Sequence, residues 1–146
     1  MNSNKGYIVF IFFIIIFFSC TSEIARVDVF KNKNVSIQVD CEKQQEIDLY
    51  IDCDIEYTEL PLMVMDFEFY RGEEQLIKGG LDPLLASPKL DEVKTELDGV
   101  THWKFYGKLE GNFIPPSDGV FSIRPTLIKN NHPNLKVNKF ELVLVR

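Results

Sequence analysis

Apolar and polar side chains alternate with a period of two through most of the chain after residue 26. This alternation is typical of β-strands that bury one face and expose the other. It is clearest at residues 47–57, where one face carries Ile47, Leu49, Ile51, Cys53, Ile55 and Tyr57. The same pattern predicts seven further strands, at residues 35–41, 62–70, 75–78, 93–97, 101–109, 120–128 and 136–145.

Clusters of Gly, Pro, Asn and Asp separate the predicted strands. Asp98-Gly99 is typical of a type I′ turn and joins the strands at 93–97 and 101–109. Residues 79–92 contain Gly and Pro breakers, so we predict the longest loop there, with a helical turn around residues 84–86. The predicted fold is therefore all-β, a two-sheet β-sandwich of about eight strands in a jelly-roll or immunoglobulin-like arrangement. It forms one domain at residues 27–146.

The first twenty residues have a different pattern. A run of strongly apolar residues, 7–18, follows Lys5 and is followed by Ser19 and Cys20. A basic start, an apolar middle and a small residue at the end are typical of a secretory signal peptide. The run is too short to cross a bilayer as a helix, which takes about 20 residues. We therefore predict a cleaved signal peptide at 1–19 and a tether at 20–26.

The end of this segment, Phe17-Phe18-Ser19-Cys20, resembles the lipobox of bacterial lipoproteins. The resemblance implies cleavage before Cys20, a thioether-linked diacylglycerol on its sulfur and an acyl chain on its new amino group. Cys20 is then a lipidation site, and the membrane is a partner through this lipid anchor. The alternative is an ordinary signal peptide that ends beside a cysteine by chance.

The residues after Cys20, Thr-Ser-Glu-Ile, place no aspartate beside the lipid. By analogy with lipoprotein sorting in diderm bacteria, this favours the outer membrane, with the domain facing the periplasm. Exposure on the cell surface is the alternative.

The charge of the mature chain is about −7, because cleavage removes Lys5 from 16 basic side chains and leaves all 22 acidic ones. An acidic surface argues against nucleic acid as a partner, since phosphates require clustered Lys and Arg. It also argues against electrostatic docking to anionic lipid. The membrane link is therefore expected to come from the acyl chains, each buried methylene contributing about 0.8 kcal/mol.

Cys41 and Cys53 remain once Cys20 is lipidated, and an exported protein permits disulfides. If the two lie on the arms of one hairpin that turns at 42–46, Cys53 pairs near Val35, and the sulfurs are too far apart to bond. Strands in different sheets, or a different register, would allow a bridge. A Cys41–Cys53 disulfide and two free buried thiols are both open at this point.

Catalytic motifs are missing from the sequence. Neither histidine, His102 or His132, has a cysteine or histidine neighbour at metal-ligand spacing. There is no Gly-x-Ser-x-Gly elbow and no phosphate-binding glycine loop. We therefore predict a protein without enzymatic activity, cofactor or bound metal.

The most prominent polar group is an acidic row on the outer face of the strand at 47–57, made of Asp48, Asp52, Asp54 and Glu56. A straight row does not converge as the oxygen ligands of a hard cation do, so it does not indicate a metal site. One interpretation is a solvated sheet face on which like charges prevent edge pairing. The other is a surface on which a basic partner docks.

The C-terminal half resembles the gliding-motility lipoprotein H family. The resemblance rests on a Trp-led strand at 103–109, a Pro- and Gly-containing turn at 115–119 and a strand that begins with Phe121. It implies a lipid-anchored, non-enzymatic component of a cell-envelope assembly, in gliding motility or the linked secretion system. Binding would use a sheet edge or an exposed loop, for which we favour residues 79–92.

Two alternatives come from other classes of protein. One is a lipoprotein that binds carbohydrate or peptide. The other is a periplasmic immunity or inhibitor lipoprotein, whose acidic face would suit a basic target.

Overall fold

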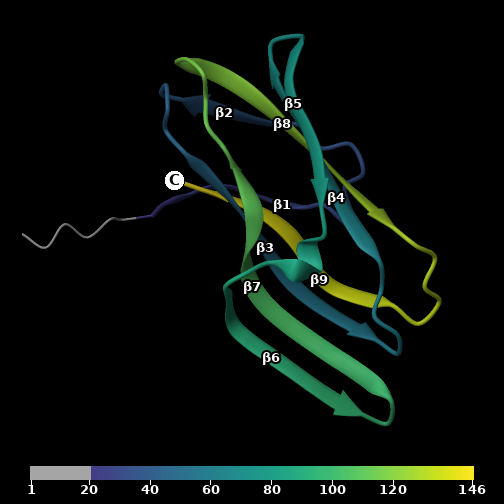
Figure 1. Cartoon of the computed structure of the whole chain (residues 1–146). Coiled ribbons are helices and arrows are strands. Elements are labelled where there is room, and N and C mark those ends of the chain that lie inside the picture. The colour runs from purple at the N-terminus through teal and green to yellow at the C-terminus, as the bar shows by residue number, and fades with distance from the viewer. Residues whose placement is uncertain (1–20) are drawn as a thin grey trace, which may run out of the picture.

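The computed structural model describes residues 21–146, which form two antiparallel β-sheets packed face to face (Figure 1). The predicted β-sandwich is confirmed, with nine strands rather than eight. The predicted signal peptide at 1–19 and Cys20 lie outside the described residues. The strands are β1 (Glu23–Asp28), β2 (Ile37–Cys41), β3 (Ile47–Tyr57), β4 (Met63–Arg71), β5 (Glu74–Leu81), β6 (Lys89–Leu97), β7 (Val100–Phe113), β8 (Gly119–Lys129) and β9 (Lys136–Val145).

The strand order is β1-β9-β3-β7-β6 in one sheet and β2-β8-β4-β5 in the other. The antiparallel pairs nest around the β4–β5 turn, because β3 pairs with β7, β2 with β8 and β1 with β9. A ribbon of nested pairs folded across two sheets is a jelly roll. The structure therefore has the jelly-roll arrangement, with β6 added at one edge of the five-stranded sheet.

The core between the sheets follows the period-two pattern of the sequence. Along β3 every odd-numbered residue from Ile47 to Tyr57 is buried, and β4 alternates in the same way. Aromatic rings fill the centre, where Phe113 stacks on Phe69 with ring centroids 4.7 Å apart. Phe121 meets Phe113 edge to face at 5.3 Å. Aromatic contacts of this geometry stabilise a core beyond the area that they bury.

Strand β1 is the element that the sequence pattern missed. The prediction placed a tether at residues 20–26, yet the sheet already begins at Glu23. The short segment alternates poorly, with burial of intermediate degree along most of its length. It is a strand because it pairs with β9, with Ala25 opposite Leu144 and Val27 opposite Leu142. Tertiary pairing therefore overrides a weak local pattern.

The loop predicted at residues 79–92 is shorter in the structure. Residues 79–81 belong to β5 and residues 89–92 to β6. Only 82–88 connect the two strands, and they contain the 3-10 helix η1 (Pro83–Leu85), which confirms a helical turn in this region. Gly79 and Gly80 lie in β5 because that strand is a sheet edge, where weak strand formers are tolerated.

The Asp98-Gly99 turn between β6 and β7 is confirmed. Both residues have positive φ, +51° and +76°. A type I′ turn requires positive φ at both of its central positions, and this twist matches that of the flanking strands.

The two ends of the sandwich carry different connections. One end, which we call the terminal end, contains Ser22, Arg146 and the connections 42–46 and 114–118. These segments lie at the same end because Ile47, at the start of β3, pairs with Phe113 and Asp48 pairs with Val145. The opposite end, which we call the distal end, contains the connections 58–62, 98–99 and 130–135. In Figure 1 the C-terminus marks the terminal end, and the tip of the β6–β7 hairpin belongs to the distal end.

Cys41 and Cys53 are free, buried thiols. They lie in different sheets, so the single hairpin considered from the sequence does not exist. Cys41 ends β2, and the chain enters β3 at Ile47 after a short connection. Cys53 is six residues further along β3, about 20 Å from Ile47 at the rise of a strand. This offset along β3 places the two cysteines beyond the short Cα separation that a disulfide needs.

Gly107 is the point at which the connection 82–88 packs against β7. A Cβ atom at Gly107 would lie 2.7 Å from the Ala86 Cβ and 3.2 Å from the Phe105 ring. Two backbone hydrogen bonds hold the same segment against β7, from Ser87 N to Lys108 O (2.7 Å) and from Lys108 N to Pro88 O (3.2 Å). The connection 82–88 therefore approaches β7 closely at this glycine.

We expect Gly107→Ala to lower the free energy of unfolding by about 2 kcal/mol. The added methyl would overlap Ala86, whose segment is held against β7 by the two backbone hydrogen bonds. Urea denaturation measures this change. Gly79→Ala is the matched control, since a Cβ there meets nothing within 4 Å and a neutral result is expected. Restoration of stability by the second change Ala86→Gly would identify the clash, whereas full stability of Gly107→Ala alone would contradict it.

Candidate functional site

The outer face of the five-stranded sheet carries the acidic row. Asp48, Asp52, Asp54 and Glu56 all project from β3 on this face and are partly exposed, as the alternation predicts. Strand β3 is central in its sheet, between β9 and β7. The interpretation that like charges protect a sheet edge is therefore wrong for this strand, because its backbone is already paired on both sides.

Each carboxylate of the acidic row meets a basic side chain from another strand of the same sheet, Lys or Arg in three cases and His102 in the fourth. The ion pairs are Asp48–Lys108 (2.8 Å), Asp52–Arg26 (2.8 Å), Asp52–Lys139 (3.4 Å), Asp54–His102 (2.9 Å) and Glu56–Lys136 (2.8 Å). The row is therefore compensated within the chain. A basic partner would have to displace these cations, which weakens the case for docking on the row by charge alone.

Arg26 on β1 binds three carboxylates at once. Its guanidinium donates to Glu23 (2.9 Å), Asp52 (2.8 Å) and Glu141 (2.9 Å), which lie on three different strands. These acceptors, Glu23 foremost, raise the pKa of Arg26 above its already high value. Arg26 thus fastens β1 to the outer face of the sheet, a role that the sequence pattern did not indicate.

Asp54 is held by two donors in the middle of this network. It accepts from Asn138 Nδ2 (3.0 Å) and pairs with His102 Nε2 (2.9 Å). Burial alone would raise the pKa of Asp54, but the hydrogen bonds from Asn138 and His102 outweigh it and hold the pKa below its usual value. Hydrogen bonds from Asn138 and Lys136 likewise lower the pKa of Glu56. Both groups are therefore carboxylates at neutral pH.

Two tyrosine rings lie on the same face. Tyr50 and Tyr106 stack with centroids 5.1 Å apart and planes 10° from parallel. Both side chains are half-buried. Trp103 is buried in the core, and its indole N–H donates to Glu92 Oε1 (2.8 Å).

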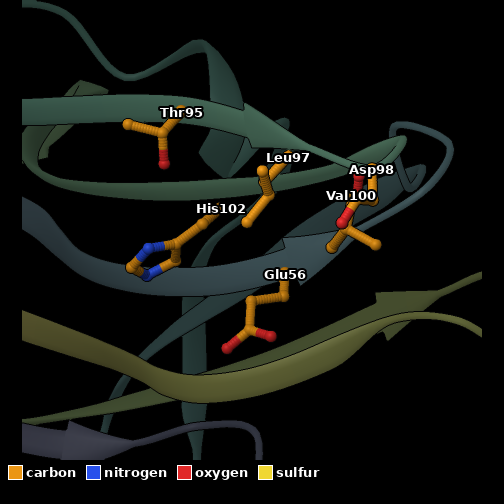
Figure 2. A pocket seen from close by; sticks show the side chains of 6 residues that line it. All are labelled: Glu56, Thr95, Leu97, Asp98, Val100 and His102. Atoms are coloured by element: carbon orange, nitrogen blue, oxygen red, sulfur yellow. The ribbon is translucent and has the colours of Figure 1, made fainter.

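A shallow groove lies at the distal end of this face, between β3 and the β6–β7 hairpin (Figure 2). Its volume is about 500 Å³ and it is open to solvent. Figure 2 shows its lining, which is Glu56, Thr95, Leu97, Asp98, Val100 and His102.

The chemistry of the groove combines two carboxylates with apolar surface. Asp98 has no ion-pair partner within residues 21–146 and supplies the negative charge, whereas Glu56 is already paired with Lys136. The exposed side chains of Leu97 and Val100 supply the apolar part. Such a lining suits a side chain with an alkyl stem and a cationic head, as in Lys or Arg. The sequence indicated Glu56 and His102 but not the other lining residues, because the hairpin is brought beside β3 only by strand pairing.

A histidine paired with a carboxylate activates a nucleophile when a hydroxyl or thiol is bonded to the imidazole. Among residues 21–146, His102 has Asp54 as its hydrogen-bond partner and no such hydroxyl or thiol bond. No group of three or more His, Cys, Asp or Glu in this range is arranged to hold a metal ion.

Searches for similar proteins give no match to this chain among family models, curated proteins or solved structures. Within the described residues, none of the helices has the length and apolar character needed to span a membrane.

Proposed function

We propose that this chain is a lipid-anchored, non-enzymatic interaction domain of the bacterial cell envelope. Lipid on Cys20 holds it at the outer membrane, on the periplasmic face, and the jelly roll binds a protein partner. The resemblance to gliding-motility lipoproteins names the assembly, which is the motility machinery or its linked secretion system. The argument for binding comes from the surface of the domain, since fold alone does not imply function.

The observation that carries the proposal is the free edge formed by β6. Among residues 21–146 this strand pairs only with β7, and all its residues after Lys89 are exposed. Three apolar side chains are at least half exposed along it, Leu90 (50%), Val93 (51%) and Leu97 (76%). A long apolar edge is a template on which an extended segment of another protein adds as a strand.

The usable part of the edge runs from Val93 to Leu97. A bulge interrupts the register between Leu90 and Val93, and Asp91 within it has a φ of +51°. Beyond the bulge the pairing with β7 is regular and ends beside the groove. An added strand would run past Val93 and Thr95 and end beside Asp98 at the tip of the β6–β7 hairpin. An extended peptide with apolar and basic residues fits this surface best.

The two alternatives have less support in the structure. A carbohydrate site needs an open aromatic platform, whereas Trp103 is buried and Tyr50 and Tyr106 cover each other's faces. An inhibitor of a basic toxin would use uncompensated acidic charge, whereas Asp48, Asp52 and Glu56 are paired with Lys or Arg of the same chain.

A photo-crosslinking amino acid at Val93 tests the proposal in living cells. We expect a specific adduct with an envelope protein, which mass spectrometry identifies after detergent extraction. Val120 is the matched control, because it is equally exposed (54%) but lies on β8, an interior strand of the other sheet. Leu97→Lys, which adds a charge to the regular part of the same edge, should reduce the adduct at Val93.

The outcomes separate the classes of function. A motility or secretion component in the adduct supports the proposed assembly, and a toxin would support an immunity protein instead. Equal adducts at Val93 and Val120, or none at Val93 in a lipidated chain, would contradict binding through β6.

A further inference from the structure

The distance between the lipidation site and the folded domain is very short. Ser22 is already fixed, because its N–H donates to Arg146 O (2.6 Å) and its carbonyl accepts from Arg146 N (3.0 Å). Cys20 precedes Ser22 by two residues, which span at most about 7 Å when fully extended. Only Thr21 therefore separates the acylated residue from the β-sheet, where the sequence pattern had predicted a tether.

The residues at the terminal end lie at the same height along the strand direction. Ile47 pairs with Phe113, and Val145 pairs with both Asp48 and Glu23. The connection that follows β7 starts with Ile114, which is 52% exposed. It lies about 15 Å from β1 across three strand spacings. The headgroup layer on each side of a bilayer is about 6 Å thick, so a 7 Å link brings this whole end to it.

We propose that the terminal end of the sandwich rests directly on the phospholipid headgroups, with Ile114 and the connection 42–46 at the membrane surface. This inference rests on lipidation at Cys20, as proposed above. The partner here is the bilayer itself. The acyl chains anchor Cys20 in it, and Thr21 alone links Cys20 to the paired Ser22. The exposed Ile114 adds apolar contact, while the charges of the neighbouring loop, such as Glu42 and Lys43, are mixed.

This orientation lifts the binding surface away from the membrane. Strand β3 has eleven residues, so the distal end lies about 35 Å from the terminal end. Strand β6 begins opposite the middle of β3, where Lys89 pairs with Gly107 and Gly107 with Ile51, and it runs to the distal end. The free edge and the groove are thus presented to the periplasm, and a partner reaches them without contacting the bilayer.

Depth-dependent quenching of a fluorescent label tests this orientation. The lipidated full-length chain is purified from the envelope with Ile114→Cys or Leu60→Cys, and the new thiol carries a nitrobenzoxadiazole label. The native thiols should not compete, because Cys41 and Cys53 are buried and burial raises the pKa of both. Vesicles of phosphatidylethanolamine and phosphatidylglycerol contain a headgroup-attached spin-label quencher.

We expect the label at position 114 to lose most of its fluorescence and the label at position 60, in the distal connection, to keep it. An insertion of about fifteen Gly and Ser residues between Thr21 and Ser22 is the control, since its reach is about 20 Å. It should leave lipidation intact and remove the quenching at position 114.

Lys33→Cys tests the other orientation, in which the connection 29–36 faces the membrane. Quenching at position 33 with none at position 114 would overturn the proposal, and so would equal quenching at 114 and 60. The mass of the purified chain is read first. A chain without lipid contradicts the proposed function, whereas a lipidated chain without quenching at 114 contradicts only the orientation.

Discussion

Phe113→Ala is expected to lower the free energy of unfolding by about 4 kcal/mol, a value typical of a fully buried phenylalanine. The side chain is completely buried at the end of β7. It contacts Phe69 and Phe121, which both belong to the other sheet. Truncation therefore leaves a cavity between the sheets, and rings on both sides lose their packing partner. Denaturation by guanidinium of a chain that begins at Thr21 measures the change.

Ile114→Ala is the matched control for this variant. Ile114 is adjacent in sequence, similar in hydrophobicity and 52% exposed. A surface substitution of this kind changes stability by no more than about 0.5 kcal/mol. If Phe113→Ala and Ile114→Ala had the same small effect, the proposed packing between the sheets at the terminal end would be incorrect.

Cys20→Ala is expected to abolish lipidation. Without the sulfur no diacylglycerol is added, so the product stays uncleaved or becomes soluble. The anchoring energy comes from buried methylenes, each worth about 0.8 kcal/mol, and two acyl chains already anchor stably. No second apolar run follows in the sequence to replace them. Palmitate labelling and membrane fractionation measure the loss.

Cys41→Ala serves as the control for the loss of a cysteine, because Cys41 is a free buried thiol in β2. Its palmitate labelling and membrane fraction should equal those of the natural chain. Unchanged labelling of Cys20→Ala would refute lipidation at this residue and, with it, the orientation inferred for the domain.

The strands that sequence reasoning located best are those with strict alternation. Strand β3 has the predicted bounds, and β4 buries every second residue. In β9 Phe140, Leu142 and Leu144 are buried, but the alternation is lost at Val143, which is fully buried as well. Each of them lies inside its sheet with one face in the core, so burial alone determines its pattern. Strands β1, β5 and β6 lie at sheet edges and were missed or shortened. One side of an edge strand is unpaired, so its pattern is weaker.

The candidate site was predictable only in part. The alternation placed the acidic row on the outer face, and the structure has it there. The cations that compensate the row come from β1, β7 and β9, which are distant in sequence. Their positions depend on which strands are neighbours and in which register. Once that order is known, the polar residues of β9 from Lys136 to Glu141 are the signal that identifies them.

The amino-acid sequence by itself determined the all-β class, the inward and outward faces of the regular strands and the Asp98-Gly99 turn. These are local properties, since each follows from side-chain alternation or from the φ angles that a few residues tolerate. The tertiary structure alone decided the jelly-roll order, the pairing of β1 with β9, the free state of Cys41 and Cys53 and the groove beside Glu56. These depend on contacts between residues far apart in the chain, whose energies only the complete packing of the two sheets determines.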